Sequence, residues 1–169
     1  MGLLNRDSAL DFKKKIISSL LEDLEAKLKL LTQAALEAHV AATHEESKAE
    51  DKYDTRGLEA SYLAGAQAKR ALEIKKQIES YKFLPINVLA DNAPIQITAL
   101  VEAEYSSKKQ MFFIVPQGGG LILDIAGLSF QIVTPISKIG EELVGRFLND
   151  SFEIEINGQN RVYKITQVF

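Results

Sequence analysis

The stretch KIISSLLEDLEAKLKLLTQAALEAHVAA, residues 15–42, decides the fold of the first half of the chain. Apolar residues recur in it at alternating spacings of four and three: Ile17, Leu21, Leu24, Leu28, Leu31, Ala35 and Ala38. This spacing puts them on one face of a helix and is the seam pattern of a coiled coil. No glycine or proline interrupts residues 3–56, as expected of a long helix.

A second helical run, from about residue 58 to 81, provides a partner for this seam. Its predicted seam consists of Ala60, Ala64, Ala68, Ala71, Ile74, Ile78 and Tyr81. Polar residues 44–54 separate the two runs, so we expect the helices to fold back on each other as an antiparallel hairpin. Ser8 is expected to cap the first helix. Alanines replace larger residues in both seams toward the turn, which predicts closely spaced axes and a slender outer half.

After Pro85 the pattern changes to short strands, predicted at residues 95–104, 110–115, 121–125, 128–133, 152–156 and 162–168, with a short helix at 139–144. Asn157-Gly158 provides the positive-φ pair of a tight hairpin. The sequence therefore predicts an α+β protein. Residues 1–84 form the antiparallel coiled-coil hairpin, with an acidic turn near 44–59, and residues 85–169 form an antiparallel, β-rich globular domain.

Composition narrows the function classes. The 169 residues carry a net charge of -3, which argues against a general nucleic-acid binder. The absence of cysteine excludes disulfides and thiolate metal sites and fits a reducing cytoplasm. Residues 1–7 do not have the pattern of a secretion signal, and no run approaches the roughly 20 apolar residues that span a bilayer. We therefore expect a cytoplasmic protein without a membrane partner.

Acids crowd the turn of the hairpin: Glu45, Glu46, Glu50, Asp51, Asp54 and Glu59. A solvated helical turn is commonly charged, so one interpretation is purely structural. The functional interpretation is that two of these carboxylates help to hold Mg²⁺, which often keeps several waters and takes only one or two carboxylates from a protein. The turn alone cannot supply all the ligands of a Mg²⁺ ion, so it would complete a metal site whose other ligands belong to a partner.

The segment SKIGEELVGRFLND, residues 137–150, resembles the Gre family of bacterial transcript-cleavage factors. The family pattern is Ser-Pro-x-Gly-x-x-Leu-Leu-Gly-x-x-x-Gly-Asp. Here Lys138, Val144 and Asn149 replace the proline, the second leucine and the third glycine. The order of hairpin and β domain agrees with the family along essentially the whole chain. The resemblance implies an FKBP-like fold for the β domain.

The resemblance also implies a partner and a mechanism. Gre factors bind RNA polymerase, insert the coiled coil into its secondary channel, and use tip acids to stabilise Mg²⁺ and a water for hydrolysis of backtracked RNA at the nascent 3′ end. The active site and the Mg²⁺ belong to the polymerase, so the protein itself is not expected to be an enzyme. It is expected to be a monomer, because the two helices of the hairpin pair with each other. Its expected polymerase-binding residues are Ser137, Lys138, Ile139 and Gly140.

The turn departs from the family pattern Asp-x-x-Glu-Asn-Ala-Glu-Tyr. Residues 54–62, DTRGLEASY, contain one extra residue between the aspartate and the tyrosine. Alignment on the tyrosine puts Leu58 at the position of the catalytic glutamate, whereas alignment on the aspartate puts Gly57 there. The resemblance therefore does not transfer the second acid directly.

Asp54 is the candidate essential acid, with Asp51 or Glu59 as its partner; the candidate metal ligands are Asp54 and Asp51. A close alternative is a secondary-channel regulator that does not stimulate cleavage. Two further alternatives are a peptidyl-prolyl isomerase, which needs an aromatic-lined pocket, and a coiled-coil adaptor that dimerises through the hairpin.

Overall fold

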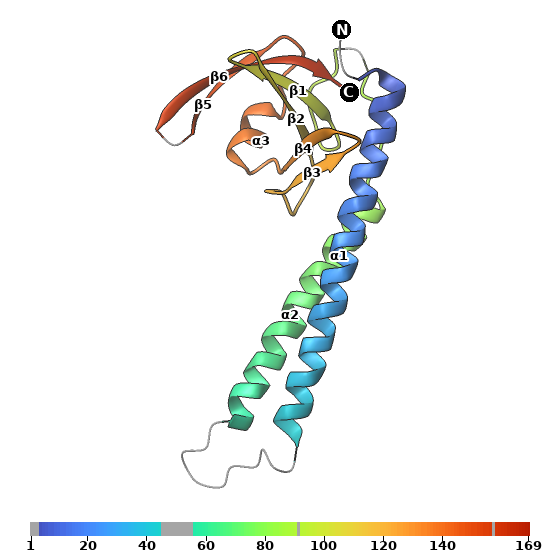
Figure 1. The fold of residues 1–169 in the computed structure, drawn as a ribbon, viewed down its shortest axis with the longest axis vertical. Coiled ribbons are helices and arrows are strands. Elements are labelled where there is room, and N and C mark those ends of the chain that lie inside the picture. Colours follow the sequence, from blue (N-terminus) through green and yellow to red (C-terminus); the bar gives the residue numbers. More distant parts are fainter. Residues whose placement is uncertain (1–3, 45–55, 91, 157) are drawn as a thin grey trace. The chain divides into compact units, whose positions relative to one another are not determined.

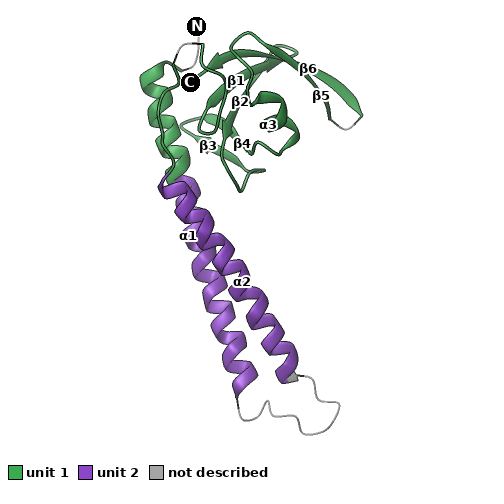
Figure 2. Ribbon diagram, turned by 180° about the vertical axis from the view of Figure 1, so that it is seen from behind, with its two compact units in different colours: residues 1–18, 84–169 green, residues 19–83 purple. Residues whose placement is uncertain are grey.

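The structure is a computed structural model that describes residues 4–44, 56–90, 92–156 and 158–169. The elements in chain order are α1 (Arg6–Thr43), α2 (Arg56–Lys82), β1 (Leu100–Tyr105), β2 (Lys108–Ile114), β3 (Ile122–Ile125), β4 (Leu128–Val133), α3 (Lys138–Leu143), β5 (Ser151–Ile156) and β6 (Gln159–Val168) (Figure 1). The chain divides into two compact units, Ser19–Phe83 and Met1–Ser18 with Leu84–Phe169 (Figure 2). Among the described helices, none is long and apolar enough to cross a membrane.

The unit Ser19–Phe83 is the predicted helical hairpin, with α1 and α2 side by side (Figures 1 and 2). Every predicted seam residue of α1 is buried or half-buried, which confirms the seam. An ion pair joins the two helices, with 3.2 Å between Lys82 Nζ and Glu25 Oε1. Apolar burial along the seam is the main stabilising term here, because helices of this kind gain more from packing than from intrinsic propensity.

The seam of α2 differs from the prediction at one position. Ala68 is exposed, and Gln67 is half-buried in its place. Gln67 continues the strict alternation of spacings of four and three from Ala64 to Ala71. The predicted seam departed from this alternation because it used the apolar Ala68. The Oε1 atom of Gln67 is buried and has no hydrogen-bond partner. The seam therefore contains one polar defect.

The start of α1 also differs from the prediction, because Asn5 caps the helix and Ser8 does not. The Ser8 backbone N–H donates to Asn5 Oδ1 at 2.8 Å, and the Asn5 N–H donates to Ser8 Oγ at 2.9 Å. This reciprocal pair satisfies two backbone donors at the helix start, as a capping box does. Helix α1 consequently begins two residues before Ser8.

The β domain is one six-stranded sheet with the order β3-β4-β2-β1-β6-β5. Adjacent strands are antiparallel except β2 and β4, which are parallel. The predicted antiparallel β domain is confirmed as an antiparallel-rich sheet, in which this one pair is parallel. The chain passes from β2 to the sheet edge as β3 and returns as β4, so β4 fits beside β2 in the same direction. The predicted hairpin is confirmed, since Ile156 pairs with Gln159 across two residues.

Strand β1 is shorter than predicted, since residues 95–99 are not part of it. Thr98 has φ 69°, a left-handed conformation that is a genuine outlier for a β-branched residue. The backbone of Ile95 pairs outside the sheet, with Gly145 and Arg146. This irregular segment forms a loop against the chain that follows α3, and it lines the cavity described below.

The two faces of the sheet bury different partners. One face packs with Leu143 of α3 in a core that includes Val101, Phe112, Ile154 and Tyr163. On β4, Phe130 lies 5.3 Å, centroid to centroid, from Phe12 in the first turns of α1. The start of α1 therefore belongs to the β unit.

Candidate functional site

Of the three acids predicted to assist a metal, the structure describes only Glu59. Asp51 and Asp54 lie outside the described residues. Glu59 is exposed in the first turn of α2, where the positive end of the helix dipole favours a carboxylate whatever its further role. Within the described ranges, no group of three or more His, Cys, Asp or Glu residues gathers as a metal site. The metal hypothesis therefore stays a prediction from sequence.

The predicted polymerase-binding segment begins with a serine and a glycine that shape the chain. Ser137 caps α3: its Oγ accepts the Gly140 N–H at 3.1 Å and donates to the Thr134 carbonyl at 2.7 Å. A Cβ on Gly140 would lie 1.9 Å from that same carbonyl oxygen. Only glycine fits there. Ser137 and Gly140 therefore act on the local fold. Ile139 is half-buried and packs against the core, which leaves Lys138 as the exposed side chain of this group.

The end of the segment is shaped in the same way. Gly145 has φ 86° and Asn149 has φ 73°. Asparagine is among the few residues that enter this left-handed region readily, so Asn149 preserves the backbone that a glycine allows. Asp150 Oδ2 accepts the Phe147 N–H at 2.8 Å and closes the turn. The features shared with the Gre pattern thus specify a backbone path.

The exposed side chains on this path are mostly apolar. Ile136 is 86% exposed, and Val144, Phe147 and Leu148 are each about 40–45% exposed. Lys138 is exposed beside them and, with Ser137 and Ile139, lines a hollow of about 200 Å³. The same path carries the exposed Glu141 and the partly exposed ion pair of Arg146 with Glu142. An exposed apolar surface bordered by charged side chains is suited to contact with a protein.

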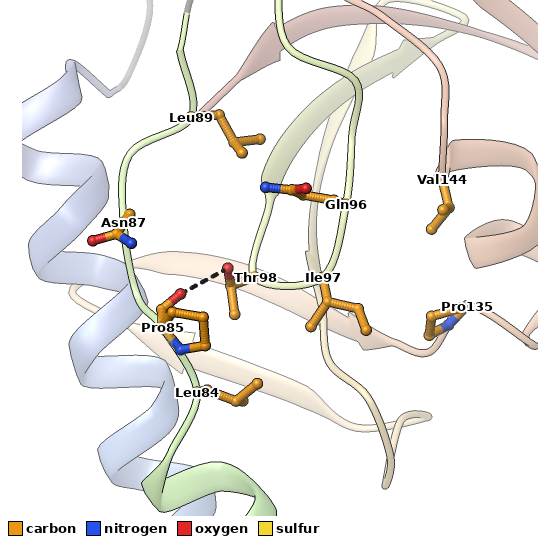
Figure 3. A pocket seen from close by; sticks show the side chains of 9 residues that line it. All are labelled: Leu84, Pro85, Asn87, Leu89, Gln96, Ile97, Thr98, Pro135 and Val144. Atoms are coloured by element: carbon orange, nitrogen blue, oxygen red, sulfur yellow. Dashed lines mark hydrogen bonds between the residues drawn. The ribbon is translucent and has the colours of Figure 1, made fainter.

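A larger cavity of about 690 Å³ lies between the segment after α2 and the loop before β1 (Figure 3). Its nine lining residues are Leu84, Pro85, Asn87, Leu89, Gln96, Ile97, Thr98, Pro135 and Val144. None of them is aromatic, although a prolyl isomerase of the type considered above needs an aromatic-lined pocket. This cavity therefore does not favour the isomerase alternative.

Among the described residues of the β unit, two charged side chains are buried. Lys13 of α1 is 0% exposed, and its Nζ donates to the Asn87 carbonyl at 2.8 Å. Desolvation by burial lowers the pKa of Lys13 to about 8. Glu102 of β1 is also fully buried, and its Oε1 accepts hydrogen bonds from Lys109 Nζ and Thr166 Oγ1, both at 2.7 Å. The hydrogen bond that Lys109 donates to Glu102 raises the pKa of Lys109.

Comparison with known proteins gives a weak likeness in structure and no match in sequence. Neither a family model nor a curated protein matches the chain. A solved structure titled as the transcription factor Gfh1 is 21% identical, with a TM-score of 0.40, over 88% of this chain and 92% of its own. The GreA factor homolog Gfh1 of Thermus thermophilus is 19% identical, with a TM-score of 0.36, over 88% and 94%.

A third structure is titled as the prokaryotic transcription elongation factor GreA/GreB from Nitrosomonas europaea. It is 14% identical, with a TM-score of 0.36, over 61% of this chain and 89% of its own. At such identities and TM-scores, the likeness does not transfer an activity or a partner to this chain.

The sequence did not reveal Lys13 or the cavity. A lysine on a charged helix is normally exposed, and only the fold puts Lys13 against Asn87. The cavity combines residues from four separate segments, so no local pattern marks it. Pro94 is a local sign of irregular structure near the cavity. The sequence prediction nevertheless placed a strand directly after it, from residue 95, where the structure has a loop.

Proposed function

We propose that this protein is a Gre-like factor that binds RNA polymerase and modulates transcription elongation from its secondary channel. The β domain docks on the polymerase, and the helical hairpin enters the channel. Carboxylates of the segment between Thr43 and Arg56 then help the Mg²⁺ of the polymerase to activate water for cleavage of backtracked RNA. The protein supplies ligands to another enzyme's centre and binds no metal stably alone.

The observation that carries this proposal is the self-paired hairpin. The seams of α1 and α2 bury each other within one chain, so the helices need no second copy to be stable. The segment that joins them has five acids in residues 44–55 and only two lysines. A monomeric two-helix rod with an acidic connector is suited to bringing carboxylates to a metal held elsewhere.

The geometry of residues 137–150 supports the same family of functions. Proline is favoured at the first position of a helix but is not required there, so Lys138 at that position of α3 is compatible with the Gre pattern. Asn149 keeps the left-handed backbone of the glycine that it replaces. The departures from the pattern are therefore conservative for the local fold, and the exposed surface around Lys138 supports docking.

The test is RNA shortening by a purified polymerase halted on a backtracked transcript, measured with binding of the protein to the polymerase. We expect shortening that depends on Mg²⁺ and that Asp54→Asn abolishes without loss of binding. Asp51→Asn and Glu59→Gln identify the second acid. Glu79→Gln, an exposed carboxylate elsewhere on α2, is the matched control.

Binding without shortening would identify the alternative, a channel regulator that does not stimulate cleavage. Failure to bind the polymerase would refute both versions. Sedimentation at micromolar concentration tests the adaptor alternative, because a hairpin whose seams are satisfied internally predicts a monomer.

A further inference from the structure

We infer that the cavity of about 690 Å³ in the β unit is a binding site for a small neutral ligand, mostly aliphatic and with one amide-like polar end. Its size lies within the roughly 300–1,000 Å³ typical of small-molecule sites. The inference goes beyond the proposed polymerase function and does not depend on it.

The lining determines the ligand class. Leu84, Leu89, Ile97 and Val144 provide aliphatic surface, and the nine lining residues include no charged side chain. A phosphate, carboxylate or ammonium placed against these aliphatic side chains would lose part of its hydration without gaining a counter-charge from the lining, which disfavours nucleotides and charged metabolites. The absence of an aromatic ring also removes the usual means of holding a flat heterocycle.

Three lining residues have polar side chains, Asn87, Gln96 and Thr98, and the Thr98 hydroxyl already donates to the Pro85 carbonyl. Figure 3 shows the Gln96 carboxamide reaching between Leu89 and Thr98. A carboxamide offers both a donor and an acceptor, so it is complementary to a primary amide, which presents the same two groups. A ligand with an aliphatic chain and an amide end would satisfy both kinds of surface.

The wall of the cavity is held in a strained arrangement. Thr98 has φ 69°, and its Oγ1 donates to the Pro85 carbonyl at 3.3 Å, the contact drawn in Figure 3. The Thr98 backbone N–H donates to the Ile114 carbonyl oxygen at 2.8 Å. Outliers of this kind cost on the order of 1–3 kcal/mol and cluster at ligand sites. The loop geometry thus points to the same place as the lining.

The experiment uses the full chain with selectively labelled methyl groups and titrates hexanamide at neutral pH, with hexanoate and hexylammonium as charged analogues of equal length. We expect saturable NMR shifts confined to the methyl groups that line the cavity. Each charged analogue should bind at least about tenfold more weakly, because its charge would be desolvated without a partner.

Two variants test the location. Val144→Lys adds a charge at a lining position that is 39% exposed, and Val162→Lys on β6, 58% exposed, is the matched control outside the cavity. Val144→Lys should abolish hexanamide binding and Val162→Lys should not; Ile97→Glu gives a second lining variant if Val144→Lys does not fold. Unsaturable shifts spread over exposed residues such as Ile136, equal binding of hexanoate, or unchanged binding by both lining variants would overturn the inference.

Discussion

Replacing Lys13 by methionine should change how the stability of the β unit depends on pH. Lys13 is fully buried, and its ammonium has one hydrogen bond, to the Asn87 carbonyl. Burial lowers its pKa from 10.5 to about 8. Since one pKa unit corresponds to 1.36 kcal/mol, burying the charged form costs about 3 kcal/mol relative to the neutral amine.

The sign follows from proton linkage. Below pH 8 both the folded and the unfolded states bind the proton, so the full cost is present. Between pH 8 and 10.5 only the unfolded state binds it, and the free energy of unfolding rises with pH. From pH 7 to 9.5 the wild-type protein should gain about 2 kcal/mol from this group alone. Lys13→Met has no proton to lose and should lack this gain.

The assay is urea unfolding at pH 7 and pH 9.5, followed by circular dichroism. The quantity of interest is the difference in unfolding free energy between the wild type and Lys13→Met, which should shift by about 2 kcal/mol toward the wild type at the higher pH. Lys14→Met is the matched control, because Lys14 is the exposed neighbour on the same helix. If the difference is the same at both pH values, the charge of Lys13 is not desolvated and the reasoning fails.

Three further substitutions have definite expected outcomes. Gly140→Ala should destabilise the β unit by more than about 3 kcal/mol, because its Cβ would lie 1.9 Å from the Thr134 carbonyl oxygen; normal urea unfolding would contradict the steric reading. Gly65→Ala should stabilise the hairpin by about 1 kcal/mol, since nothing lies within 4 Å of the new Cβ, and a lower melting temperature would refute this. Gln67→Leu should stabilise it by about 1 kcal/mol by removing an unpartnered buried oxygen. Ala68→Leu, on the exposed neighbour, should not, and equal effects of the two changes would show that Gln67 is not in the seam.

The sequence predicted those parts of the fold that local spacing controls. The seam of α1 follows from the recurrence of its own apolar residues, and the β5–β6 hairpin follows from its two turn residues. Gln67 was missed because a polar residue in a seam contradicts the hydrophobic pattern, even though its spacing is right. The parallel pairing of β2 with β4 depends on contacts between distant segments, which no window of sequence contains.

The candidate site also has features that local sequence determines and features that depend on contacts between distant segments. The backbone roles of Ser137, Gly140 and Asn149 are local, so a sequence pattern can carry them. The burial of Lys13 and the cavity beside Asn87 depend on how α1 and the segment after α2 meet the sheet. The resemblance predicts Ser137 and Gly140 as partner contacts. The structure gives both a role in the local fold, and their contact with a partner stays a prediction.

In the proposed function, docking and cleavage depend on different parts of the chain: the segment 137–150 and the turn between the two helices. In the segment that resembles the Gre pattern, Asn149 adopts a left-handed conformation that glycine also adopts readily, so this replacement is compatible with the same backbone path. In the turn, one extra residue lies between Asp54 and Tyr62, and an insertion changes which side chains share a face. In the proposed function, we expect the first change to leave polymerase binding intact and the second to affect the acids alone. Deleting one residue of 55–58 should therefore alter RNA shortening while leaving the affinity for polymerase unchanged; a matched loss of both would show that the turn contributes to docking.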